Sequence, residues 1–135
     1  MSDTTAPATV VFVCLHGAAK SVIAAALFDR LAASRGIAAR AAFAGTEPDA
    51  EIAPAVLAAL RQGGTDLRGH RPRTPAPGEL DAAARVVAFG CDVTAHTRRP
   101  DVEQWADVPA VSADYATAHA AIERRVETLV AEMSP

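Results

Sequence analysis

The sequence is poor in cysteine, in aromatic residues and in lysine. Its two cysteines, Cys14 and Cys91, lie far apart without CxxC or Cys/His zinc spacing, so we expect neither a metal site nor a disulfide framework. In a reducing compartment both begin as free thiols. Aromatic residues make up 4% of the chain and alanine much of its apolar half, which favours a core built from small side chains.

Long apolar runs and a large excess of charge are also absent. No stretch approaches the length needed to cross a bilayer, and Met1 to Thr9 carries no basic residue, unlike a secretion signal. The formal net charge of −3 gives no general attraction for nucleic acid or anionic membranes. We therefore predict a cytoplasmic protein that binds an anion only through a local arrangement.

The length of 135 residues is typical of one domain, with residues 1 to 8 as a flexible N-terminus. Apolar runs ending in glycine or cysteine predict buried strands, and apolar residues at helical spacing predict helices. The predicted strands cover 9–13, 37–44 and 85–89, the predicted helices cover 21–35, 54–62, 79–84 and 113–133, and 94–107 is expected to be loop. Strands that alternate with helices indicate an α/β domain with a parallel sheet, whose ligands bind beyond the carboxyl ends of the strands.

One loop at that edge carries residues suited to chemistry. The strand 9–13 leads into Cys14-Leu-His-Gly-Ala-Ala-Lys20-Ser21 and then into a helix. Backbone N–H groups of such a loop, with the helix N-terminus, favour an anion and also the thiolate form of Cys14. Lys20 adds a cation, and the Ser21 hydroxyl is placed to bond the sulfur. The plainer alternative is that Cys14 is a small core residue and Lys20 a solvated surface charge.

The segment VVFVCLHGAAKS resembles the signature of the low-molecular-weight phosphotyrosine phosphatase and arsenate reductase superfamily, in which a strand is followed by Cys, five residues, Arg and Ser. It is especially similar to the arsenate reductase form Cys-Val-His-Asn-Ala-Gly-Arg-Ser, with matches at Cys14, His16, Ala18 and Ser21. The segments AGTEP, GTDLRGHRPR and VVAFGCD resemble later motifs of the superfamily, so that the likeness covers residues 9 to 133.

The resemblance implies a fold and a chemistry. The fold is a single three-layer α/β domain with a four-stranded parallel sheet in the order 2-1-3-4 and helices on both faces. The thiolate of Cys14 is then the nucleophile, and the oxyanion lies in the ring formed by Leu15, His16, Gly17, Ala18, Ala19 and Lys20. In phosphatases the thiolate attacks phosphorus and an aspartate protonates the leaving group. In arsenate reductases it attacks arsenate, and further thiols reduce the adduct.

Two residues of the loop depart from the superfamily pattern. Lys20, the only lysine beside 12 arginines, stands where the superfamily has its signature arginine. Lysine is a point charge on a flexible stem and cannot hold two oxygens with a planar fork, so we expect weaker stabilisation of the transition state. Gly17 replaces an asparagine that braces the loop, which predicts a less ordered loop.

Later residues leave several assignments open. Asp107, which follows Trp105, is the first candidate for the general acid and Asp92 the second, although an N-capping or loop carboxylate is an equal alternative for Asp107. Cys91 matches the first extra cysteine of the reductases and is a possible resolving thiol, although a buried strand-end residue is the plainer account. His70 and its neighbouring arginines either flank the anion site or form a solvated basic connection.

These observations predict a cysteine-dependent oxyanion enzyme, either a phosphatase-like hydrolase or an arsenate-reductase-like protein. The alternative is a catalytically weak protein that binds phosphate or a phosphorylated partner. The expected partners are phosphate, arsenate or a phosphorylated substrate, with an external thiol reductant for a reductase and no other cofactor. Nucleic acid and membranes are not expected partners.

Overall fold

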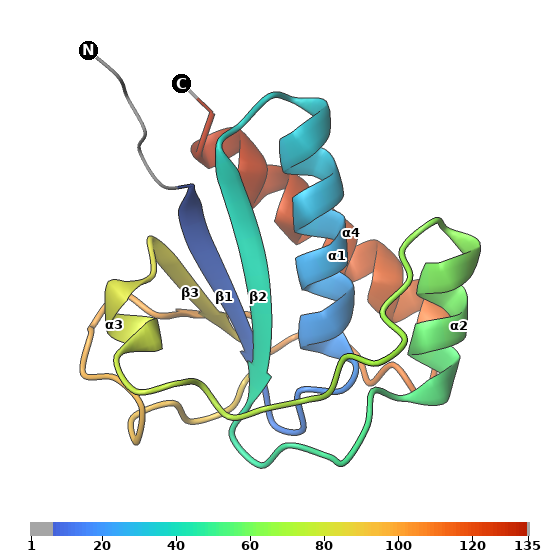
Figure 1. Ribbon diagram of the computed structural model, residues 1–135, viewed down its shortest axis with the longest axis horizontal. Helices are drawn as coiled ribbons and strands as arrows, with labels where there is room; N and C mark the ends of the chain where they lie inside the picture. Colours follow the sequence, from blue (N-terminus) through green and yellow to red (C-terminus); the bar gives the residue numbers. More distant parts are fainter. Residues whose placement is uncertain (1–6, 135) are drawn as a thin grey trace.

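The computed structural model describes residues 7–134 and forms an α/β fold (Figure 1). Strands and helices alternate for most of the chain. In order they are β1 (Ala8–Cys14), α1 (Lys20–Ser34), β2 (Ala39–Gly45), α2 (Pro54–Gln62), α3 (Glu79–Ala82), β3 (Arg85–Ala88), β4 (Glu103–Gln104) and α4 (Tyr115–Glu132). Over these residues no helix is both long and apolar enough to span a bilayer.

The four strands form one parallel sheet in the order β2-β1-β3-β4, which confirms the predicted order. β1 lies in the interior, where Phe12 pairs with Phe43 of β2 and with Val87 of β3. Its last five residues are buried, as expected of a strand covered on both faces. Cys14 pairs with Gly45, so these two strands end together at the edge where such sheets bind ligands.

Helices cover both faces of the sheet, as predicted. α1, α2 and α4 lie on one face and α3 on the other (Figure 1). Side chains alternate along β1, so that Phe12 and Cys14 join the larger core cluster while Val11 and Val13 join the smaller one beneath α3. The fully buried Phe12 ring contacts Phe28 and Trp105, with centroid distances of 6.1 and 5.8 Å.

The predicted helix over residues 54–62 is confirmed, and the other predicted elements differ at their ends by one or more residues. The prediction of loop throughout 94–107 was wrong, because β4 lies inside this segment. Glu103 and Gln104 carry no apolar pattern, and only their pairing with Val87 and Ala88 of β3 makes them a strand.

The predicted flexible N-terminus extended too far along the chain. Ala8 begins β1, where its N–H donates to Ala38 O at 3.1 Å and it pairs with Ala39. Of the predicted segment, residues 1–6 lie outside the described part of the chain.

Candidate active site

The loop between β1 and α1 places a thiol at the carboxyl edge of the sheet. Cys14 is the last residue of β1 and only 7% of its surface is exposed. Its Sγ lies 3.0 Å from the hydroxyl Oγ of Ser21, a fully buried residue in the first turn of α1. The sequence predicted this contact, and the hydroxyl is placed to donate to a thiolate.

Four carbonyl groups of the loop turn toward the segment that follows β2. The amides of Thr46, Glu47, Asp49 and Ala53 donate to the carbonyl oxygens of Cys14, Leu15, His16 and Ala18, at 3.2, 2.7, 3.0 and 3.0 Å respectively. Because C=O and N–H of one peptide unit point in opposite directions, these bonds turn the following N–H groups to the other side of the loop. In residues 7–134 no protein acceptor bonds the amides of Leu15 to Ala19. This is the arrangement of an anion-binding loop.

Two glycines let the loop rest directly on the end of β2. Gly17 has φ of +61°, and a Cβ built on it would lie 2.7 Å from Gly45 N. A Cβ on Gly45 would lie 2.6 Å from Gly17 N. The absence of asparagine at Gly17 predicted a poorly braced loop, but the backbone bonds to residues 46–53 supply a brace of another kind.

Lys20 lies at the edge of the site and reaches the far part of the chain. Its Nζ donates to the carbonyl oxygen of Val108 at 2.8 Å, which ties the start of α1 to the segment after β4. Val108 is buried, so the ammonium group is held close to the protein interior. The cation expected from the sequence is therefore present at the loop, although its hydrogen bond goes to a carbonyl group.

A cavity of about 560 Å³ opens above the loop, a size suited to a small ligand. Most of its surface is apolar, and Cys14, His16, Lys20 and Asp49 are among the residues that line it. The remaining walls come from α2, from Phe89 after β3, from the residues before α4 and from Tyr115; they include Ala53, Ala55, Val56, Ala110, Val111 and Ser112.

His16 turns toward the segment after β2. Its Nδ1 lies 3.1 Å from Glu47 O and 3.4 Å from Asp49 Oδ1, and both side chains of the latter pair are more than half exposed. Asp49 is thus a carboxylate on the wall of the Cys14 cavity that the sequence analysis did not single out. Its position in the loop after the predicted second strand was the one available signal.

The structure does not place Asp107 at the Cys14 cavity. Its carboxylate accepts a hydrogen bond from Arg125 of α4 at 2.5 Å and lines a separate polar hollow beside Trp105. Arg125 holds the pKa of Asp107 below its ordinary value. Because this ion-paired carboxylate does not line the Cys14 cavity, the structure gives the general-acid assignment of Asp107 no support, and that assignment stays a prediction.

Cys91 and Asp92 lie beside the Cys14 loop in an adjoining cavity of about 430 Å³. The Cys91 thiol donates to Val13 O at 3.5 Å and packs with the cluster beneath α3, whereas Cys14 packs with the cluster on the other face. Both cysteines are free. Burial raises the pKa of Cys91 and the nearby Cys14 raises it further, while hydrogen bonds from Thr94 lower the pKa of the exposed Asp92.

The basic segment 68–73 does not flank the anion loop. His70, Arg71 and Arg73 line a different cavity along the outer edge of β2, and Arg68 is paired with Asp66. Among residues 7–134 no three His, Cys, Asp or Glu side chains are grouped as metal ligands would be.

A family model for low molecular weight phosphotyrosine protein phosphatases matches residues 9–126. This range contains the Cys14 loop and all the strands of the sheet except Ala8, the first residue of β1. The chain belongs to this family. No curated protein matches it.

Solved structures share the fold. YfkJ from Bacillus subtilis superposes with a TM-score of 0.81 at 21% identity, over 96% of each chain. A thioredoxin-dependent arsenate reductase of Corynebacterium glutamicum gives 0.77 at 22% identity, over 97% of this chain and 64% of the other. An arsenate reductase from Archaeoglobus fulgidus gives 0.68 at 29% identity, over 90% of this chain and 98% of the other. Arsenate reductases thus share the scaffold of this chain.

Proposed function

We propose that this family member is an oxyanion enzyme whose nucleophile is the Cys14 thiolate. The observation that carries the proposal is the position of Cys14 Sγ at the start of a loop whose Leu15 to Ala19 amides bond no acceptor in the described chain. Ser21 supports the same role with its hydroxyl 3.0 Å from the sulfur. The ligand is phosphate, arsenate or a phosphorylated substrate, held without a resident cofactor.

With a phosphate monoester, the reaction takes place in two displacements. The Cys14 thiolate attacks phosphorus, the bond to the leaving oxygen breaks, and a cysteinyl-phosphate forms. Water then attacks phosphorus, the S–P bond breaks, and the thiolate and inorganic phosphate are regenerated. The loop amides stabilise the negative oxygens that develop in each transition state.

The leaving group receives little help from the protein in this arrangement. Asp107 is paired with Arg125, and the carboxylate on the cavity wall is Asp49, which contacts His16. A substrate whose leaving oxygen is already a weak base, such as an aryl phosphate, needs less protonation than an alkyl phosphate. We therefore propose that aryl phosphates are the better substrates of the hydrolytic reaction.

With arsenate, Cys14 attacks arsenic and an oxygen leaves as water, giving a thiol adduct of As(V). A second thiolate then attacks the Cys14 sulfur, a disulfide forms, the S–As bond breaks, and the two electrons of that bond leave with arsenic as arsenite. Cys91 is half-buried with a raised pKa, which makes it a weak nucleophile at neutral pH. An external thiol reductant is therefore favoured as the second thiol, with Cys91 as the alternative.

A binding protein is the second candidate, and one contact favours it. Lys20 donates to the Val108 carbonyl and lacks the fork with which arginine holds two oxygens of a transition state. Such a site retains the amides that bind a phosphate or a phosphorylated partner, while the chemical step is slow.

The experiment compares the wild-type protein with Cys14→Ser and with Cys91→Ser as the matched control. Hydrolysis of p-nitrophenyl phosphate and reduction of arsenate in the presence of dithiothreitol are measured for each. Turnover that is lost in Cys14→Ser and kept in Cys91→Ser supports the enzyme. Thermal stabilisation by phosphate without any turnover supports the binding protein, and neither turnover nor stabilisation contradicts both.

A further inference from the structure

The outer edge of the sheet has a gap in its hydrogen bonds. β2 is an edge strand, and in a parallel pair alternate residues bond to the same neighbour, so its odd-numbered residues turn their N–H and C=O groups outward. Ala41 N–H donates to Asp29 Oδ1 at 2.7 Å, and Gly45 N–H donates to Arg73 O at 2.8 Å. Between them, Phe43 N–H bonds no acceptor within residues 7–134.

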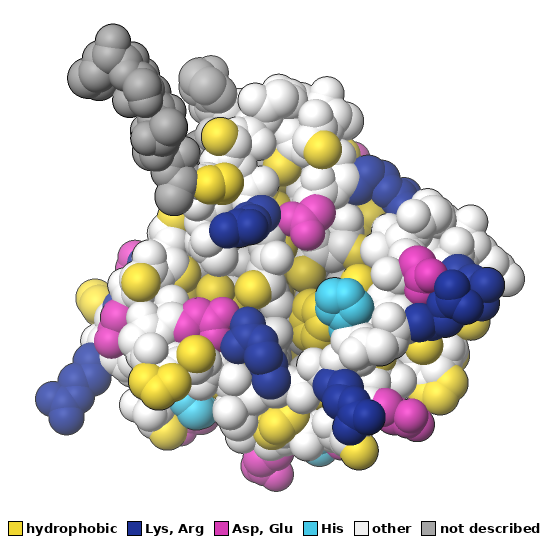
Figure 2. All heavy atoms as spheres, viewed as in Figure 1, with side chains coloured by type: hydrophobic (Ala, Val, Ile, Leu, Met, Phe, Trp, Pro, Cys, Tyr) yellow, Lys and Arg dark blue, Asp and Glu magenta, His cyan; other side chains and the backbone are white. Residues whose placement is uncertain are grey.

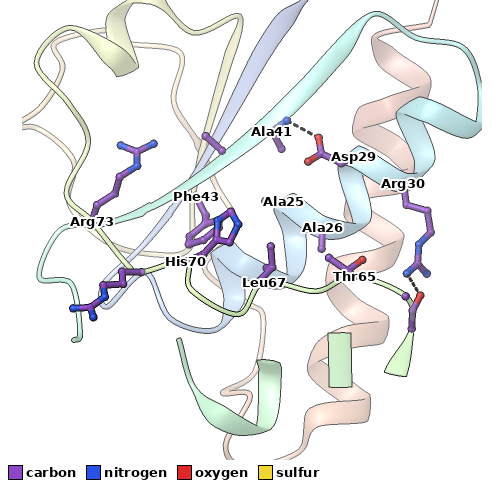
Figure 3. A pocket seen from close by; sticks show the side chains of 14 residues that line it. Ala25, Ala26, Asp29, Arg30, Ala41, Phe43, Thr65, Leu67, His70 and Arg73 are labelled. Carbon is purple, nitrogen blue, oxygen red and sulfur yellow. Dashed lines mark hydrogen bonds between the residues drawn. The ribbon is translucent and has the colours of Figure 1, made fainter. Parts of the chain in front are cut away.

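A cavity of about 730 Å³ lies over this gap. Figure 3 shows it bounded by β2, by α1 and by the segment that contains Leu67 and His70, with Phe43 and Ala25 facing into it. Figure 2 shows the same hollow as an apolar floor bordered by a histidine and by charged side chains. The carbonyl group of Arg73 bonds the amide of Gly45, and the chain then leads away from β2. No described backbone segment bonds the outer edge of β2 at Phe43, so the space there is open.

The rim of the cavity is mainly basic. Arg30 donates to Gly63 O at 2.6 Å, and Arg73 holds Glu79 with two bonds of 2.7 Å. The side chains of Arg71 and His70 also line the cavity and make no hydrogen bond or ion pair with the described residues. Asp29 is the acid among the lining residues, and desolvation by the protein around it raises its pKa. The unpaired charge of Arg71 favours an acidic occupant.

We propose that this cavity binds an extended acidic peptide segment of a partner protein, which adds to β2 at Phe43. The exposed groups decide between a peptide and a simple anion. Phe43 offers a donor, while the outward carbonyl groups of Ala41 and Phe43 are acceptors, and an anion cannot bond an acceptor. A peptide backbone supplies both kinds of group, its alternate side chains fit an apolar floor, and acidic residues meet Arg71. This site is separate from the Cys14 cavity and does not depend on the proposed reaction.

The test uses an acetylated and amidated hexapeptide of alternating Glu and Val, with a Lys-Val hexapeptide as the charge-reversed control. ¹⁵N-resolved spectra of the whole protein follow amide shifts and hydrogen exchange during titration. We expect shifts at residues 25–29, 41–43 and 65–73, slower exchange of the Phe43 amide, and no binding of the Lys-Val peptide.

Variants test the role of charge. Arg71→Glu is expected to weaken binding of the Glu-Val peptide by about fivefold or more, which corresponds to the loss of one exposed ion pair. Arg98→Glu, at another exposed arginine, is expected to leave the affinity unchanged. If Arg71→Glu fails to fold, the comparison of the two peptides on the wild-type protein still decides.

The proposal would be overturned by an unchanged Phe43 amide at saturating Glu-Val peptide, by equal binding of the two peptides, or by equal affinity of Arg71→Glu and the wild type. Shifts at residues 41–43 that grow with protein concentration alone would also overturn it, because a second copy of the chain would then occupy the edge.

Discussion

Lys20 stands beside the Cys14 loop and makes a hydrogen bond to a distant backbone carbonyl group. It follows the Cys14 loop, at the position where the resemblance in sequence predicts an arginine, and its ammonium group bonds the Val108 carbonyl. A single hydrogen bond to a neutral carbonyl is weaker than a bond to an oxyanion, so an anion in the loop competes for the same group. At the scale of one residue, the balance between these two partners sets how strongly the site stabilises a transition state.

Lys20→Arg is expected to raise the turnover of p-nitrophenyl phosphate by about tenfold, which corresponds to about 1.4 kcal/mol of transition-state stabilisation. The physical reason is the planar fork, which holds two oxygens at once. Steady-state kinetics measure the effect, with Lys20→Met as the variant that removes the charge. A Lys20→Arg protein slower than the wild type would show that the site is adapted to lysine.

Asp107→Asn is expected to change kcat/KM for p-nitrophenyl phosphate by less than about twofold, because Asp107 is ion-paired outside the cavity. The pH dependence of the rate should keep its shape. A fall of about a hundredfold would identify Asp107 as the general acid after all.

The same pair gives a prediction for stability against pH. The pKa of Asp107 is lowered in the fold from 3.8 by Arg125, so the pair contributes stability above pH 3.8 that is lost as the pH falls through the folded value. Urea unfolding at neutral and at acidic pH should therefore show that Arg125→Ala destabilises the protein only at the higher pH. Equal destabilisation at both pH values would mean that packing of Arg125 over Trp105 dominates.

At the scale of elements, the anion loop is held by the segment between β2 and α2. Four backbone hydrogen bonds and the contact of Gly17 with Gly45 fix the loop against that segment. The brace contains no asparagine side chain, and the chain has no asparagine at all. The shape of the site therefore depends on the end of β2 as much as on the loop itself.

Gly45→Ala is expected to abolish stabilisation by phosphate in a thermal unfolding assay, because the added Cβ would lie 2.6 Å from Gly17 N and displace the loop. Gly63→Ala is the matched control, since Gly63 has φ of −83° and the atom nearest to its added Cβ, 3.3 Å away, belongs to the flexible Arg30 side chain. Phosphate binding retained in Gly45→Ala would show that the loop does not need this contact.

The elements differ in how well the sequence predicts them. β1 and β3 are continuous apolar runs, a pattern that predicts buried strands. The Cys14–Ser21 contact is predicted by the order of a strand, a loop and a helix along the chain. β4 has no such pattern and exists only through its pairing with β3. The brace of the loop, the Lys20–Val108 bond and the Asp107–Arg125 pair join residues far apart in the chain, so local patterns could not reveal them.

At the scale of the molecule, a chain with net charge −3 presents two sites suited to anionic ligands. The Cys14 cavity relies on backbone amides and one ammonium group, and the cavity along β2 relies on an open strand edge and a basic rim. Both use local fields, since the overall charge would repel an anion. The parallel sheet makes the first site possible because it ends β1 and β2 together.

The central claim is that Cys14 carries a negative charge within a ring of amide protons, and alkylation by iodoacetamide tests it most directly. Mass spectrometry of the modified peptides follows Cys14 and Cys91 separately across pH, with and without phosphate. We expect Cys14 to be protected by phosphate and to react before Cys91, whose pKa is raised by burial. A Cys14 that reacts no faster than Cys91, and at the same rate with phosphate present, would contradict the account.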